Sequence, residues 1–222
     1  LSLPCFSFIF IYFSFISHTN STIGFDLIWT ADVTGLIKQW QPNGKLKKAI
    51  STEKMQCASA FSAMAVVGQN MWAAAYDVIV PFDAKGNWYK KRRLVLENKW
   101  GVLCLLSHNR KVWLGTTQGI VTVNAEDMTV MNYFPEKVGG VTDLIPVGAN
   151  VWSCCMDGFI RIWDGETGKC LQFIGLDTSC QGSFPYKFAR IGSSIWCLLN
   201  NGSIVVYDPK SLFVLGVVGS AV

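Results

Sequence analysis

From Val151 to Asp164 the chain reads VWSCCMDGFIRIWD, in which two runs of strand-forming residues flank Asp157-Gly158. An Asp-Gly pair supplies the backbone angles of a tight turn between two antiparallel strands. Related phrases open with an aliphatic residue or Met followed by Trp, at Ile28-Trp29, Met71-Trp72, Val112-Trp113, Val151-Trp152 and Ile195-Trp196. Successive Trp residues lie 43, 41, 39 and 44 positions apart. A period of about 40 residues with several short strands indicates a β-propeller of four-stranded blades.

Each copy of the phrase predicts four strands. Thr34-Gly35, Gln118-Gly119 and Asn201-Gly202 stand where Asp157-Gly158 does, whereas the second copy has Asp77-Val78, so its turn is expected to be longer or strained. A second turn and an outer strand follow, and an apolar strand precedes each of the last four Trp residues. The expected order is therefore inner strand, Trp-bearing strand, third strand and outer strand.

The fold class expected is all-β, with about five blades over residues 25–222. Residues 17–25 do not match the inner-strand pattern, so the first blade is expected to lack its inner strand. We read the chain as part of a larger, seven-bladed ring; the alternative is a closed ring of five blades.

Residues 1–24 are expected to lie outside the fold. Their first 17 residues, LSLPCFSFIFIYFSFIS, are apolar and uncharged. The codons of these residues are rich in T and C, which favours a gene-model artefact. A secretion signal or membrane anchor and a core strand are the alternatives, although a signal normally has a basic start and a spanning helix needs about 20 apolar residues.

The composition argues against most enzyme classes. Charged residues make up 15% of the chain, only two histidines occur, and no pair of the eight cysteines has metal-binding C-x-x-C spacing. Motifs for a serine nucleophile, a phosphate-binding loop or a zinc protease are absent from the sequence. We therefore expect no catalytic residue, no metal and no cofactor. The net charge of +4 is too small to indicate nucleic acid.

The run from Phe159 to Leu171 resembles the end of a WD40 repeat, including its Trp163-Asp164 dipeptide and a Thr-Gly-Lys turn. The other copies depart from it with Trp40-Gln41, Phe82-Asp83, Val123-Asn124 and Tyr207-Asp208, and the Gly-His dipeptide of the family is missing. The family's Asp–His–Ser/Thr–Trp hydrogen-bond network is therefore not expected here. The chain is similar to the divergent WD40-like modules of Rab and Rho exchange factors, Roco-type kinases and inositol-polyphosphate phosphatases.

That resemblance implies a partner-binding rim formed by the turns between second and third strands. The candidates are Asp32, Thr34, Tyr76, Asp77, Gln118, Met156, Asp157, Asn200 and Asn201. Tyr76 and Met156 are the preferred contacts because they are the apolar members. The five phrase-opening Trp residues are expected instead to pack between blades.

Lys90, Lys91, Arg92 and Arg93 form the densest basic cluster, and they are predicted to lie on an outer strand. Charge on such an edge strand prevents wrong pairing, which is the simpler interpretation. The cluster is also the candidate anion-binding patch, able to attract an acidic partner or anionic lipid headgroups.

The function expected is a non-catalytic, cytoplasmic scaffold for protein–protein interactions, within a larger signalling or trafficking protein. Its partners would be other proteins or peptides and flanking domains of the same polypeptide. Membrane contact is expected only through the N-terminal segment or the basic cluster. The alternative is a secreted or periplasmic propeller enzyme or sugar binder, which the glycosylation motifs at Asn20 and Asn201 leave open.

Overall fold

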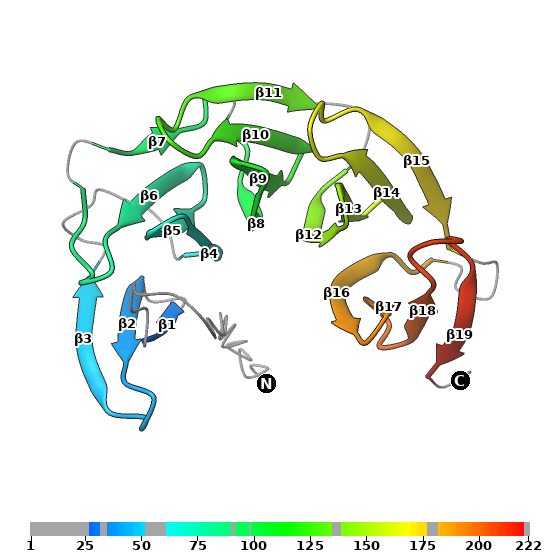
Figure 1. Cartoon of the computed structure of the whole chain (residues 1–222), viewed down its shortest axis with the longest axis horizontal. Coiled ribbons are helices and arrows are strands. Elements are labelled where there is room, and N and C mark those ends of the chain that lie inside the picture. Colours follow the sequence, from blue (N-terminus) through cyan, green and yellow to red (C-terminus); the bar gives the residue numbers. More distant parts are fainter. Residues whose placement is uncertain are drawn as a thin grey trace, which may run out of the picture. The chain divides into compact units, whose positions relative to one another are not determined.

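The computed structural model describes residues 27–31, 35–51, 61–89, 92–97, 99–134, 139–176 and 182–219. These residues form nineteen strands and no helix, arranged as five open antiparallel sheets (Figure 1). The chain divides into two compact units, the first ending at Lys99 and the second beginning at Trp100. The all-β class predicted from the sequence is confirmed.

The first unit holds two sheets. Sheet I has the strands β1 (Ile28–Ala31), β2 (Leu36–Trp40) and β3 (Leu46–Ser51). Sheet II has β4 (Ala63–Val67), β5 (Asn70–Ala75), β6 (Val78–Phe82) and β7 (Leu94–Val95). The first blade was expected to lack its inner strand because residues 17–25 do not match the pattern. These residues lie outside the described part of the chain, as does the whole segment 1–24.

The second unit holds three four-stranded sheets. Sheet III has β8 (Val102–His108), β9 (Lys111–Thr116), β10 (Ile120–Asn124) and β11 (Val130–Phe134). Sheet IV has β12 (Val141–Val147), β13 (Asn150–Cys155), β14 (Phe159–Asp164) and β15 (Cys170–Gly175). Sheet V has β16 (Pro185–Ile191), β17 (Ser194–Leu199), β18 (Ile204–Tyr207) and β19 (Val214–Val218). Sheets II to V all follow the predicted strand order.

Neighbouring sheets within a unit pack through the predicted Trp residues. Trp29 of sheet I contacts Phe82 of sheet II, with ring centroids 6.1 Å apart. Trp152 of sheet IV contacts Phe188 and Tyr207 of sheet V, both at 6.4 Å. Trp29, Trp72, Trp113 and Trp152 are at most 2% exposed, which confirms their prediction as core. Trp196 of sheet V differs, because it is only half-buried.

A β-bulge recurs just before the end of the third strand. In sheet I, where β2 corresponds to the third strand of the other sheets, the register against the outer strand shifts between Gln39 and Trp40. In sheet IV it shifts between Ile162 and Trp163. Sheets III and V have the same shift before Val123 and Tyr207. Because a bulge strengthens the local twist of a strand, the repeated shift gives these sheets a common shape.

The turns after the third strands are held by the side chains predicted for them. Asp164 Oδ1 accepts hydrogen bonds from the backbone N–H of Thr167 at 2.6 Å and from its hydroxyl at 2.7 Å. Asp208 Oδ1 accepts from the Lys210 N–H at 2.9 Å. The hydrogen bond from the Thr167 N–H is the largest of the effects that lower the pKa of the Asp164 carboxyl. The bond from the Lys210 N–H is the largest of those that lower the pKa of Asp208. Both residues therefore serve the turn itself.

Candidate partner-binding rim

Three turns of the second unit lie between second and third strands, at residues 117–119, 156–158 and 200–203. We call them the rim turns. Each is bonded to the residue that leads into the first strand of the same sheet. The Thr117 N–H donates to the Gly101 carbonyl at 2.8 Å, Met156 donates to Gly140 at 2.8 Å, and Asn200 donates to Phe184 at 3.1 Å.

These equivalent bonds join each rim turn to the chain entering its sheet. A turn anchored at both strand ends and by this third contact presents its side chains from a defined position. Gln118, Met156, Asp157, Asn200 and Asn201 are thereby placed at equivalent positions of three successive sheets. Asp32 and Thr34, the candidates from the first copy, lie outside the described residues.

Most polar candidates on the rim turns bind their own surroundings. Asp157 forms an ion pair with Arg161, at 2.9 Å to Nη1 and 2.6 Å to Nη2. Asn200 Oδ1 accepts from the Phe184 N–H at 2.7 Å, and Asn201 Oδ1 accepts from the Ser203 N–H at 2.9 Å. Their side chains therefore shape the turns, which leaves less of their hydrogen-bonding capacity for a partner.

Met156 is the exposed apolar side chain of this set. It is 45% exposed, and its sulfur lies so close to Gly140 that a Cβ there would approach it to 2.8 Å. Because Gly140 has no Cβ, the Met156 thioether can pack directly against it. An unbranched, polarisable side chain held in this way can adapt to varied apolar partners.

Tyr76 occupies the corresponding turn of the first unit, between β5 and β6. The turn is Tyr76-Asp77 rather than the predicted Asp77-Val78, and it is no longer than two residues. Tyr76 carries the positive φ, at 56°, so of the two expected outcomes the turn is strained rather than longer. The side chain is 52% exposed. Strain at an exposed aromatic residue is a feature that functional positions often show.

The described half of the predicted basic patch, Arg92 and Arg93, does not lie on an outer strand. The outer strand of sheet II is only β7, and Arg92 and Arg93 precede it. Both arginines are exposed, while Lys90 and Lys91 lie outside the described residues. The predicted strand placement was therefore wrong for Arg92 and Arg93. Ahead of them, Trp88 forms an isolated bridge with Phe82. Anion binding by this cluster stays a prediction.

An ion pair between the buried Asp143 and the exposed Lys187, which the sequence analysis missed, joins sheets IV and V. Asp143 of β12 is 9% exposed, accepts from the Phe188 N–H at 2.8 Å, and meets Lys187 Nζ at 3.0 Å. Burial raises the pKa of the Asp143 carboxyl, and the Lys187 charge offsets this only in part. The signal available was a charged residue inside the otherwise apolar run Val141 to Val147.

The described part of the chain holds neither a metal-binding cluster nor a membrane-spanning helix. No group of three or more His, Cys, Asp or Glu residues there is placed to hold a metal ion. No helix in the same residues has the length and apolar character to cross a membrane. The five described cysteines, Cys104, Cys154, Cys155, Cys170 and Cys197, are free thiols.

Comparison with known proteins gives a partial relative and a similar fold. No protein-family model matches the chain. The probable serine/threonine-protein kinase roco6 of Dictyostelium discoideum is 22% identical over 120 residues, which are 51% of this chain and 5% of the kinase. The crystal structure of the computationally designed Ika8 protein is similar with a TM-score of 0.60 and 16% identity, over 88% of this chain and 57% of the designed one. The chain thus shares a fold with the designed protein and spans a small part of the kinase it matches.

Proposed function

We propose that the five sheets are blades of a WD40-like β-propeller that acts as a non-catalytic scaffold for protein–protein interactions. The repeat of about 40 residues, the common strand order and the recurring bulge support the propeller. The Trp163–Ser153 and Trp40–Thr30 hydrogen bonds, at 2.9 and 2.8 Å, support the WD40 likeness. They correspond to part of the family network that the missing Gly-His had argued against.

The observation that carries the scaffold proposal is the common construction of the rim turns. Three successive sheets present equivalent turns, each tied to its own sheet by the same backbone bond. Their polar groups are largely used within the turn, while Met156 is exposed and Tyr76 is exposed in the first unit. Rigid turns with a few adaptable apolar contacts suit the recognition of peptides and protein surfaces.

The partial match to a much longer kinase supports a place within a larger signalling protein. The free thiols of Cys104, Cys154, Cys155 and Cys197 are buried, in keeping with a reducing compartment such as the cytoplasm. Asn201 of the second glycosylation motif lies in an exposed turn. Mass spectrometry of the protein from its native cells should find Asn201 without a glycan; an occupied site would favour the secreted alternative.

Selection of peptides from a random display library tests the rim directly. Met156→Asp and Tyr76→Asp should each reduce binding of the selected peptides at least tenfold, because a charge would replace an apolar contact. Glu166→Lys is the matched control, since Glu166 is an exposed residue of a turn after a third strand. If the selected peptides bind wild type and all variants equally, the rim proposal is wrong.

A further inference from the structure

Lys48 of β3 reaches from sheet I to the turn at residues 83–87 of sheet II. Its ammonium group donates to the Gly86 carbonyl at 2.9 Å, to the Lys85 carbonyl at 3.3 Å and to Asn87 Oδ1 at 3.4 Å. These bonds hold the turn against the outer strand of sheet I. They also bring Lys85 next to the lysines of β3.

This junction gathers lysines, and we call the set of Lys45, Lys47, Lys48 and Lys85 the lysine patch. All of them except Lys48 are exposed. Among the described residues, no carboxylate forms an ion pair with any of these three exposed ammonium groups. The nearby Asp83 carboxylate instead accepts from the backbone N–H and the side-chain amide of Asn87, at 2.7 and 2.8 Å. The patch therefore carries an excess of positive charge.

A single lysine is enough to hold such a turn. In the second unit, Lys111 of sheet III donates to the Glu166 carbonyl, in the turn at residues 164–169 of sheet IV. The charges there are balanced, because Asp164 and Glu166 match Lys111 and Lys169. The three exposed lysines of the lysine patch thus exceed what the turn needs.

Protection of an edge strand does not account for these lysines either. A lysine on an outer strand blocks wrong pairing with another sheet. However, the outer strands β7, β11, β15 and β19, with the sequences LV, VMNYF, CLQFIG and VLGVV, carry no charged residue. Among the described outer strands only β3, with the sequence LKKAIS, is charged. Because the other sheets do without charge at this edge, the charge on β3 indicates a partner.

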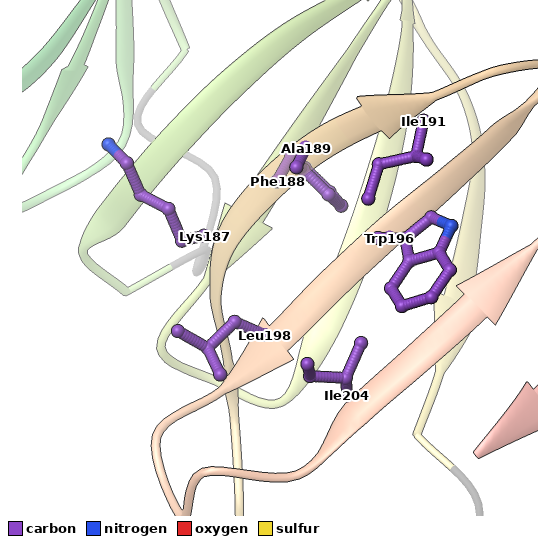
Figure 2. A pocket seen from close by; sticks show the side chains of 7 residues that line it. All are labelled: Lys187, Phe188, Ala189, Ile191, Trp196, Leu198 and Ile204. Atoms are coloured by element: carbon purple, nitrogen blue, oxygen red, sulfur yellow. The ribbon is translucent and has the colours of Figure 1, made fainter. Parts of the chain in front are cut away.

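The apolar pocket around Trp196 of sheet V gives no comparable signal. Figure 2 shows the side chains that line this pocket, which has a volume of about 240 Å³. Lys187 is the one charged residue of the lining, and its ammonium group is paired with Asp143 at 3.0 Å. An apolar lining does not select one occupant over another, whereas unneutralised charge selects a partner of opposite sign. The lysine patch is therefore the surface whose chemistry specifies what it binds.

We propose that the lysine patch binds an acidic segment of a partner protein. Each exposed ion pair contributes little because water and salt screen it, so the segment presents several carboxylates at once. The patch holds no aromatic side chain on which the bases of a nucleic acid could stack. That the partner is a protein rests on the function proposed above, whereas its acidity follows from the charge of the patch. The patch and the Tyr76 turn lie at opposite ends of β6 and are separate sites.

Fluorescence anisotropy with a labelled peptide of glutamate residues tests the proposal. Wild type should bind it at least about tenfold more tightly than a glutamine peptide of the same length, and less tightly as salt concentration rises. Reversal of the three exposed charges should weaken binding of the glutamate peptide about tenfold or more, in the variant Lys45→Glu, Lys47→Glu, Lys85→Glu. The matched control makes the same change in net charge at exposed residues of the second unit, as Lys169→Glu, Arg190→Glu, Lys210→Glu. It should bind within about twofold of wild type.

A rim variant separates this proposal from the function on which it rests. Met156→Asp should bind the glutamate peptide as wild type does, and the charge-reversed variant should keep its binding of peptides selected on the rim. If circular dichroism shows that the charge-reversed variant does not fold, glutamine at the same three positions should still weaken binding. Equal losses in the patch and control variants, or equal binding of glutamate and glutamine peptides, would overturn the proposal. So would patch-dependent binding of phosphatidylserine vesicles or single-stranded DNA that is tighter than binding of the glutamate peptide.

Discussion

Trp163 Nε1 donates a hydrogen bond to Ser153 Oγ at 2.9 Å, from β14 to the neighbouring strand β13, and both residues are fully buried. The pair Trp40 and Thr30 is bonded in the same way at 2.8 Å in sheet I. The other three sheets have neither an indole at the first position nor a hydroxyl at the second. The residues at these two positions are Phe82 and Ala73, Val123 and Leu114, and Tyr207 and Cys197. In both sheets I and IV the indole N–H thus has a hydroxyl acceptor on the neighbouring strand.

Ser153→Ala should therefore lower the free energy of unfolding by about 1–3 kcal/mol, the cost of leaving a buried donor unpaired. The same change should cost less in a Trp163→Phe background, where no N–H is left to satisfy. Urea unfolding of the four proteins of this cycle measures the coupling. Thr30→Ala is the matched control and should cost less, since Trp40 is half-buried and water can reach it. Equal costs of Ser153→Ala in both backgrounds would contradict this account.

Gly115 of β9 lies at a close approach between sheets III and IV. A Cβ there would collide with the Cys104 thiol, and it would lie 2.8 Å from Val141 Cγ1 and 2.9 Å from the Val141 carbonyl. Gly115→Ala should destabilise the protein by about 1–3 kcal/mol through overpacking. Gly216→Ala in β19 is the control, because nothing lies within 4 Å of its Cβ position. Thermal melts of the two variants that coincide would argue against so close a contact.

Asp143 should make stability depend on pH in an unusual direction for a carboxylate. Burial raises its folded-state pKa above the ordinary value of 3.8, so the folded protein holds the proton more tightly than the unfolded chain. Its contribution to stability is therefore fully present at low pH and falls as pH rises through the window between the two pKa values. Asp143→Asn should remove this fall while its amide oxygen still accepts the Phe188 N–H.

Urea midpoints at a series of pH values measure the effect as the difference between wild type and Asp143→Asn. The urea midpoint of wild type should fall relative to that of Asp143→Asn as pH rises through that window. Asp143→Ala should instead cost about 1–3 kcal/mol at all pH values, because the Phe188 amide is left unpaired. If the urea midpoint of wild type instead rises relative to that of Asp143→Asn with rising pH, the Lys187 charge affects the pKa of Asp143 more than burial does.

Thiol reactivity should separate the described cysteines by burial. Burial raises the pKa of Cys104 and Cys154 well above the usual range and that of Cys155 to about 11. Iodoacetamide, which attacks the thiolate, should modify the half-buried Cys170 before these three in the folded protein. Peptide mass spectrometry after brief labelling, with and without urea, identifies the sites. Early labelling of Cys154 in native protein would mean that sheets IV and V separate readily.

The amino-acid sequence by itself determined the repeated unit. Strand periodicity, the Trp spacing and the turn residues are local properties, and so the strand order of sheets II to V and the Asp-capped turns at Asp164 and Asp208 could be predicted from it. The positions of the rim turns were also predictable, because a turn residue acts on its own few neighbours.

The tertiary structure decided what each repeated residue does. Trp152 and Trp196 occupy the same place in their phrases, yet one is 1% exposed and the other is half-buried, because burial depends on whether another sheet packs against that face. The Asp143–Lys187 pair likewise joins residues that are far apart in the chain and lie in different sheets. Local pattern specifies a strand and its two faces, whereas only packing between sheets determines which face is covered and by what.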